Sequence, residues 1–78
     1  MVNNKLELAV IIPVYNEEEI ISTVLSEWYQ KLKELEINFE IHVYNDGSKD
    51  NTLKNITETS ELLEKIIVHD KVNSGHGP

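Results

Sequence analysis

The chain has 78 residues, of which 40% are apolar and 27% charged, a composition typical of a small globular domain rather than a disordered segment. Its net charge of −7 argues against a general affinity for nucleic acid or for anionic membranes. The absence of cysteine excludes disulfides and thiolate metal sites. No apolar run is long enough to span a bilayer and no signal-peptide pattern opens the chain, so we expect a cytoplasmic location.

Residues 6–12 are predicted to form the first strand. The run is almost continuously apolar, which suits a parallel strand covered on both faces better than an alternating edge strand. Pro13 follows and is expected to end the strand, because proline has no amide hydrogen to give to a sheet ladder.

Residues 17–36 carry the clearest periodicity in the chain. Apolar side chains recur every three or four residues, which predicts an amphipathic helix of about five turns with Trp28 in the core. Asn16 is the expected N-cap, and the acids Glu17 to Glu19 complement the positive end of the helix dipole. The apolar stripe comprises Ile20, Ile21, Val24, Leu25, Trp28, Leu32 and Leu35.

Two more strands and a second helix are predicted to follow. Residues 39–44 alternate between apolar and polar side chains, as a strand does. The turn that follows leads to a helix ending near residue 64, for which Ser48 or Asp50 is the expected cap, and residues 66–68 form a third strand. The order predicts parallel strands joined by right-handed crossovers. The expected fold class is therefore α/β, a Rossmann-like βαβαβ unit.

The carboxyl ends of parallel strands lie on one edge of a sheet. The segments at these ends are "PVYNE" after the first strand, "NDGS" after the second and "NSGHG" after the third. Each holds polar or turn-forming residues, and the topology brings the three together. Since open α/β sheets bind their ligands at this edge, the sequence predicts a ligand site there.

Three segments, "IIPVYNEEE", "IHVYNDGSKDNT" and "NSGHGP", resemble in order and spacing the N-terminal motifs of family 2 glycosyltransferases with a GT-A fold. That family includes dolichyl-phosphate-mannose-synthase-like and polysaccharide-building enzymes. The resemblance covers nearly the whole chain. It implies that residues 1–78 form a single nucleotide-binding unit, truncated from a larger glycosyltransferase domain. The parent protein would transfer a sugar from a UDP- or GDP-type donor to an acceptor hydroxyl, in the cytoplasm or at the cytoplasmic face of the membrane.

The resemblance also assigns roles to single residues. It implies that Pro13 and Tyr15 line the base pocket, that Glu17 lies near the ribose and that Asp46 contacts the base. A tyrosine offers a π-face for stacking, and carboxylates accept hydrogen bonds from ribose hydroxyls or a base imide. Glycines let the backbone pass close to a ligand. The implied nucleotide-binding residues are Pro13, Tyr15, Glu17, Asp46, Gly47 and Gly75.

The sequence departs from the family pattern in two places. Asn45 stands where the usual Asp-Asp-Gly-Ser has its first acid, so hydrogen bonding is kept and a charge is lost. The Asp-x-Asp that holds Mg²⁺ or Mn²⁺ against the diphosphate, and the general base, are both absent from the 78 residues. Transfer to a hydroxyl needs charge neutralisation and a positioned base. We therefore expect no catalytic residue and no metal ligand in this chain, and no transfer by it alone.

Two other interpretations remain open at this point. One is a non-catalytic binding or interaction module that keeps the fold without the chemistry. A flavodoxin-like protein is disfavoured, because no G-x-G-x-x-G opens the first helix. The spacing of His42, His69 and His76 does not suggest a zinc site. Residues 8–12 are expected to be an open apolar edge, and such edges recruit other chains, so we predict self-association through this strand or the nearby helix face.

Overall fold

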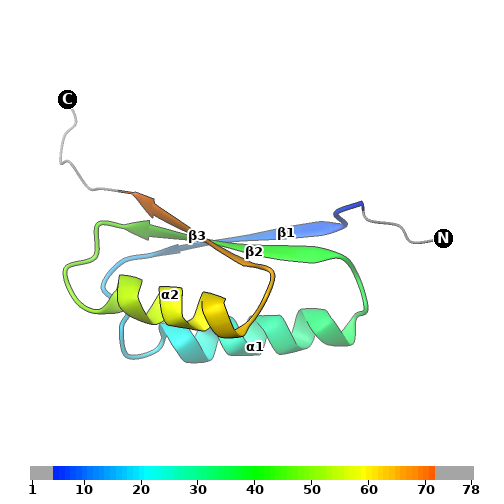
Figure 1. The fold of residues 1–78 in the computed structure, drawn as a ribbon, viewed down its shortest axis with the longest axis horizontal. Helices are drawn as coiled ribbons and strands as arrows, with labels where there is room; N and C mark the ends of the chain where they lie inside the picture. Colours follow the sequence, from blue (N-terminus) through cyan, green and yellow to red (C-terminus); the bar gives the residue numbers. More distant parts are fainter. Residues whose placement is uncertain (1–4, 72–78) are drawn as a thin grey trace.

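The computed structural model describes residues 5–71 and confirms the α/β class. Strands and helices alternate along the chain, and the strands form a parallel sheet in the order β1-β2-β3 (Figure 1). The elements are β1 (Leu8–Val14), α1 (Ile21–Glu34), β2 (Phe39–Asp46), α2 (Thr52–Leu62) and β3 (Ile66–Lys71). No helix in this part of the chain is both long and apolar enough to cross a membrane.

Both helices pack against the same face of the sheet (Figure 1). Two successive crossovers of the same hand give this arrangement when the strand order follows the chain order. The register places Val14, Asn45 and Asp70 side by side at the carboxyl ends of the three strands. The loops after β1 and β2 therefore leave the sheet at the same edge.

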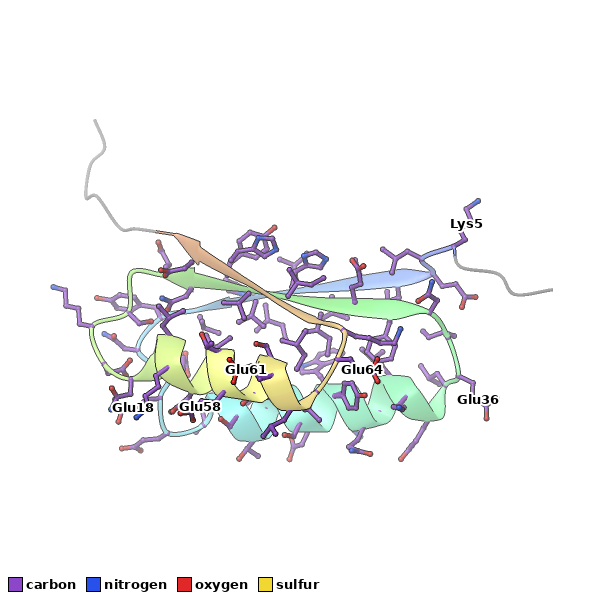
Figure 2. The ribbon with its side chains drawn as sticks, in the orientation of Figure 1. Lys5, Glu18, Glu36, Glu58, Glu61 and Glu64 are labelled. Carbon is purple, nitrogen blue, oxygen red and sulfur yellow. The ribbon has the colours of Figure 1, made fainter. Side chains whose placement is uncertain are left out.

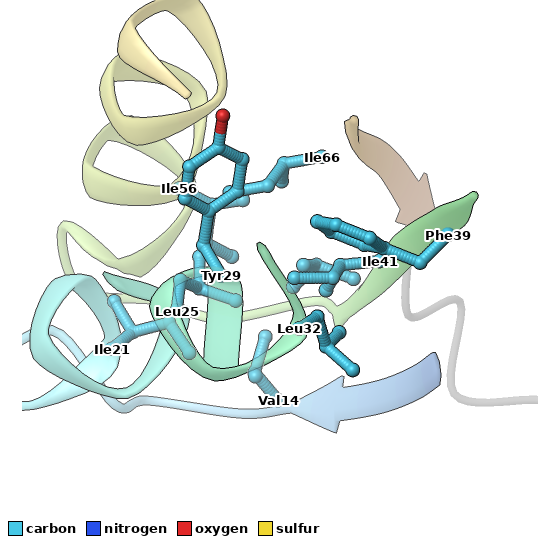
Figure 3. Close-up of a cluster of buried hydrophobic side chains, with 10 residues drawn as sticks. Val14, Ile21, Leu25, Tyr29, Leu32, Phe39, Ile41, Ile56 and Ile66 are labelled. Carbon is cyan, nitrogen blue, oxygen red and sulfur yellow. The ribbon is translucent and has the colours of Figure 1, made fainter. Parts of the chain in front are cut away.

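The core lies between this sheet face and the two helices (Figure 3). Alternation in β2 behaves as predicted, with Phe39, Ile41 and Val43 buried toward the helices. Leu25 of α1 and Ile56 of α2 meet them from the other side. The remaining buried apolar residues are Val14, Ile21, Tyr29, Leu32 and Ile66.

Trp28 does not lie in the core, contrary to the sequence prediction. Its side chain is 42% exposed, whereas Tyr29 is 6% exposed and packs edge-on against Phe39 with ring centroids 5.9 Å apart. Two apolar stripes overlap in this helix, and only one can face the sheet. The stripe that begins at Ile21 is buried, and the one that contains Ile20, Val24 and Trp28 turns outward.

Two predicted boundaries also differ. Pro13 does not end β1, which continues to Val14. β1 is an edge strand of the described sheet, where a missing amide hydrogen need not interrupt the ladder. Helix α1 begins at Ile21 instead of residue 17, because residues 17–20 form a separate turn in which the Ile20 and Ile21 amides donate to the Glu17 carbonyl.

Candidate functional site

The candidate site is the edge of the sheet at which β1 and β2 end. Tyr15 follows the last residue of β1 and is 47% exposed, and Asp46 is the exposed last residue of β2. Gly47 comes next, with a φ of 67° that lies in the left-handed region and favours glycine. The structure thus brings the aromatic and the acid predicted to contact a base to one edge of the sheet.

Asn16 joins the two loops and does not cap α1 as the sequence predicts. Its amide nitrogen donates to Ser48 Oγ at 2.9 Å, and its Oδ1 accepts from the Lys49 amide at 2.8 Å. This reciprocal pair holds Asn16 at a φ of 52°, a conformation that asparagine tolerates better than most residues. The cap position of α1 falls to Ile20, whose side chain makes no capping bond.

Side chains at the start of α2 hold the turn that follows Asn16. The Glu17 amide donates to Thr52 Oγ1 at 2.7 Å, and the Asn51 amide donates to Glu18 Oε1 at 2.9 Å. Asn55 Nδ2 also donates to the Glu18 carbonyl at 2.8 Å. The loop after β1 is therefore fixed by α2, which determines where Tyr15 and Glu17 are presented.

Asp50 is the residue that satisfies an amide at the start of α2. Its Oδ1 accepts from the Thr52 amide at 2.9 Å and from the Thr52 hydroxyl, and its Oδ2 accepts from the Glu18 amide at 3.4 Å. Desolvation raises the pKa of Asp50, but these hydrogen bonds outweigh it and hold the pKa below its ordinary value. The cap position of α2 is Asn51, whose side chain makes no capping bond, so neither expected residue is the N-cap. Asp50 bonds the Thr52 amide from the position before it, and Ser48 bonds Asn16 and Asn45.

Asn45 is buried and bonds the neighbouring strand, a structural role that the sequence analysis did not predict. Its side chain is 2% exposed, its Nδ2 donates to Asp70 Oδ1 at 3.0 Å and its Oδ1 accepts from the Ser48 hydroxyl. The alternation of β2 contained the signal, because Asn45 shares the inward face with Ile41 and Val43. Asn45 therefore ties β2 to β3, and its neighbour Asp46 is exposed to solvent.

The remaining predicted residues are placed as follows. Pro13 is exposed and pairs in register with Tyr44, and Glu17 is half-buried. Gly75 lies outside the described residues. A hollow of about 420 Å³ adjoins the site and is lined by Asn16, Glu17, Glu18, Glu19, Ile20 and Asp50.

This hollow is acidic, because four of its lining residues carry carboxylates, so it offers no electrostatic attraction to a diphosphate. Within residues 5–71, no group of three or more histidines and carboxylates is arranged to hold a metal ion. The described residues that line the hollow include four carboxylates and no lysine or arginine.

A second polar group lies on the sheet face opposite the buried residues of β2, the face over which Figure 2 shows no helix. His42 Nδ1 lies 2.8 Å from His69 Nε2, and His42 Nε2 lies 2.9 Å from Glu40 Oε1. Tyr44 stacks on His69 with ring centroids 4.2 Å apart. The sequence analysis did not predict that these side chains lie together. Tyr44 and His69 are aligned by the register between two strands, which the sequence of neither strand determines.

Comparison with known proteins decides the family. The model of glycosyl transferase family 2 matches residues 9–78, which include both loops of the candidate site. The chain belongs to this family. The resemblance noted from the sequence motifs is confirmed.

Individual relatives agree with this assignment. The chain is 32% identical over 71 residues to the undecaprenyl-phosphate 4-deoxy-4-formamido-L-arabinose transferase of Proteus mirabilis, covering 91% of the chain and 22% of that protein. It is 42% identical over 61 residues to an uncharacterized glycosyltransferase of Synechocystis, covering 78% of the chain and 19% of the relative. An uncharacterized glycosyltransferase of Bacillus subtilis is 36% identical over 76 residues, which cover 91% of the chain and 22% of the relative. The chain thus spans about a fifth of the length of these curated relatives.

Proposed function

We propose that this chain is the nucleotide-binding part of a glycosyltransferase that uses a nucleotide-diphosphate sugar. The observation that carries the proposal is that Tyr15 and Asp46 both lie exposed at the same edge of the sheet. Two hydrogen bonds fasten their loops to one another: Asn16 Oδ1 accepts from the Lys49 amide, and Thr52 Oγ1 accepts from the Glu17 amide. Family membership supports sugar transfer in general, and the donor class is our inference from the site.

The proposed pose follows from the chemistry of each side chain. Tyr15 stacks on the base, because almost half of its surface is open to solvent beside the strand end. The Asp46 carboxylate accepts a hydrogen bond from the base, and Glu17 accepts from the ribose hydroxyls. Pro13 contributes apolar contact, and the glycines at positions 47 and 75 allow the backbone to pass close to the nucleotide.

The diphosphate requires a cation that the described residues do not provide. We propose that Mg²⁺ or Mn²⁺ accompanies the donor and is held elsewhere in the complete enzyme. The metal would neutralise the diphosphate as its bond to the anomeric carbon breaks, while a base takes the proton of the attacking hydroxyl. On this proposal, the 78-residue chain binds nucleotide weakly and transfers no sugar.

The acceptor class is proposed from the relatives. Several of them are named as undecaprenyl-phosphate sugar transferases, so we propose a lipid-linked acceptor at the cytoplasmic membrane face and a role in cell-envelope polysaccharide synthesis. This part of the proposal concerns the whole protein. The chain matches only about a fifth of the length of the relatives.

A second candidate function is a non-catalytic interaction module. It is favoured by the exposed apolar side chains of Trp28 on α1 and of Leu35 at the C-cap, and by the place of β1 at an edge of the described sheet. We propose self-association through that edge, residues 8–12, as a property of this chain under either function.

Binding measurements on paired variants test the nucleotide proposal. UDP and GDP are titrated in the presence of Mn²⁺ into the wild-type chain and into Tyr15→Ala and Asp46→Asn. We expect at least about a tenfold loss of affinity in each variant, since each removes a stacking or hydrogen-bond contact. Glu58→Gln, an exposed position on α2, is the matched control and should bind as the wild type does. Equal affinity in all four proteins would place the nucleotide elsewhere.

A further inference from the structure

Four polar side chains contact one another in a row on the sheet face opposite the core. Glu40 Oε1 lies 2.9 Å from His42 Nε2, and His42 Nδ1 lies 2.8 Å from His69 Nε2. The His69 ring then stacks on the ring of Tyr44, with the two planes 7° apart. We call these four residues, three from β2 and one from β3, the histidine array.

Glu40 determines which nitrogen of His42 carries the hydrogen. A carboxylate only accepts hydrogen bonds, so the contact with Glu40 requires a hydrogen on His42 Nε2. A neutral imidazole has one N–H, which leaves His42 Nδ1 as a bare acceptor. The contact between the two rings therefore requires a hydrogen on His69 Nε2. Both neutral rings are thus in the Nε2–H tautomer.

His69 Nδ1 can take a further proton without breaking either bond. Within residues 5–71 this nitrogen makes no hydrogen bond, so a proton added there displaces no described partner. The resulting imidazolium keeps its Nε2–H and still donates to His42 Nδ1. If that hydrogen moves across the bond, His42 becomes the imidazolium and donates to both Glu40 and His69. The two rings can therefore share one positive charge with every bond kept.

Both ends of the array favour this shared charge. Glu40 places a carboxylate against His42, and a hydrogen bond between ionised partners is stronger than one between neutral groups. Tyr44 offers its π-face to His69 at a centroid distance of 4.2 Å, which is within the range of cation–π contacts. The added charge therefore lies between a negative group and an aromatic face.

The neighbours of the array within the sheet are apolar. The register places Ile11 of β1 and Ile67 of β3 on the two sides of His42. Pro13 of β1 lies beside Tyr44 in the same way. None of these three neighbours can ionise, so they neither supply nor remove a proton.

Other charged residues lie toward the two ends of the strands. Asp46 and Lys71 occupy paired positions two residues beyond the stacked rings. Glu7 precedes β1, and its Oε1 accepts from the Asn38 amide at 2.8 Å. Among residues 5–71, the ion pair to a histidine comes from Glu40. The helices contribute no charge to the array, because both cover the opposite face of the sheet (Figure 1).

A second added proton cannot be held in the same way. With both rings doubly protonated, His42 Nδ1 and His69 Nε2 would each carry a hydrogen and face one another at 2.8 Å. No acceptor remains between them, and two positive charges repel at this distance. The bond that joins β2 to β3 on this face must then break, one residue before Asn45 and Asp70 in their strands.

We propose that the histidine array binds one added proton, shared by His42 and His69, and that a second proton breaks the bond between them. The two histidines then titrate as one unit, in two steps that belong to the pair. The bonds that carry the proposal lie within the described sheet and do not require that this face be uncovered. The proposal is also independent of nucleotide binding.

Nitrogen NMR of the imidazole rings tests the proposal on the wild-type chain. At about pH 8.5, above the ordinary histidine range, both rings should show a protonated Nε2 and a bare Nδ1. A scalar coupling across the hydrogen bond should connect His42 Nδ1 with His69 Nε2. As the pH falls to about 4, this coupling should survive the uptake of the first proton and vanish with the second.

A pair of substitutions tests the role of Glu40. Glu40→Leu removes the acceptor that fixes the tautomer, so the Nδ1–H form of His42 should become detectable at the alkaline end of the titration. Glu61→Leu, at an exposed position on α2, is the matched control and should leave both tautomers unchanged.

The wild-type spectra decide the proposal even if a variant fails to fold. A hydrogen on Nδ1 of His42 at the alkaline end would overturn the assignment of the tautomers and the proposal with it. Separate single-step curves without a coupling would show that the two histidines bind protons independently. Loss of the coupling with the first proton would contradict the shared charge.

Discussion

The Thr52 hydroxyl accepts a hydrogen bond from the backbone amide of Glu17 at 2.7 Å, across 35 residues of sequence. Thr52 is fully buried at the first turn of α2, and Glu17 lies in the loop that presents Tyr15. This bond, with the reciprocal contacts of Asn16, makes the two loops at the sheet edge a single structural unit. The candidate site therefore depends on the start of α2 as much as on the strands.

Thr52→Val is expected to destabilise the fold and loosen the site. Valine keeps the shape of threonine but leaves the Glu17 amide without its acceptor, which should cost about 1–3 kcal/mol in the free energy of unfolding. Urea denaturation followed by circular dichroism measures the change. Thr52→Ser, which keeps the hydroxyl, is the control, and its free energy of unfolding should fall clearly less than that of Thr52→Val. Equal stability of Thr52→Val and the wild type would show that the bond contributes nothing.

Asn45→Asp should also destabilise the protein, although it restores the acid common in the family. The new carboxylate would be buried 3.0 Å from Asp70 without the amide donor that now joins them, at an expected cost of about 2–4 kcal/mol at pH 7. Adding Asp70→Asn to Asn45→Asp should recover most of the loss, because the donor then comes from the other strand. Thermal unfolding of the wild type, both single variants and the double variant measures this, and additive effects of the two substitutions would argue against an interaction between Asn45 and Asp70.

Stability should depend on the ionisation of Asp50. Its pKa is lowered in the folded chain, because hydrogen bonds from Thr52 and Glu18 outweigh desolvation, which acts in the opposite direction. The contribution of the carboxylate is therefore complete above its ordinary pKa of 3.8 and is lost as the pH falls through the lower folded value. Urea midpoints from pH 6 to pH 2.5 should show an advantage of the wild type over Asp50→Asn that disappears at the acid end. A constant difference across that range would contradict this assignment.

Tyr29 is buried in the core and its neighbour Trp28 is exposed, so truncating each residue in turn compares a core position with a surface position on the same helix. Tyr29→Ala should cost about 3–5 kcal/mol, as large-to-small changes of buried aromatic residues do. Trp28→Ala should cost less than about 1.5 kcal/mol when both are measured at concentrations where the chain is monomeric. If Trp28→Ala were the more damaging change, the helix would be rotated relative to the structure described above.

The sequence predicted the fold well, because each element carries its own pattern. The alternation in β2 and the helical period of α1 are local, and parallel topology follows from the order of elements. The choice between Trp28 and Tyr29 was not local, since two apolar stripes overlap and the sheet selects one. The prediction that Asn16 caps the first helix was wrong for the same reason, since long-range contacts decided it. Asn16 bonds Ser48 and Lys49, more than thirty residues away, and not the adjacent helix.

The candidate site was predicted in part. Tyr15 and Asp46 reach the same edge because strand ends and turn residues determine their positions. The hydrogen bonds that hold these loops join segments that no short-range pattern relates. Thr52 and Asp50 accept from the Glu17 and Glu18 amides, and Asn55 donates to the Glu18 carbonyl. The pairing of His42 with His69 depends in the same way on strand register.

The measurement that tests the central claim most directly is a titration of this chain with UDP and with GDP, with and without Mn²⁺, followed by amide NMR shifts. We predict shifts concentrated at Tyr15, Glu17, Asp46 and Gly75, weak binding that is independent of metal, and a tighter ligand that identifies the base. No shift at millimolar nucleotide would contradict nucleotide binding by this chain and would favour the interaction module.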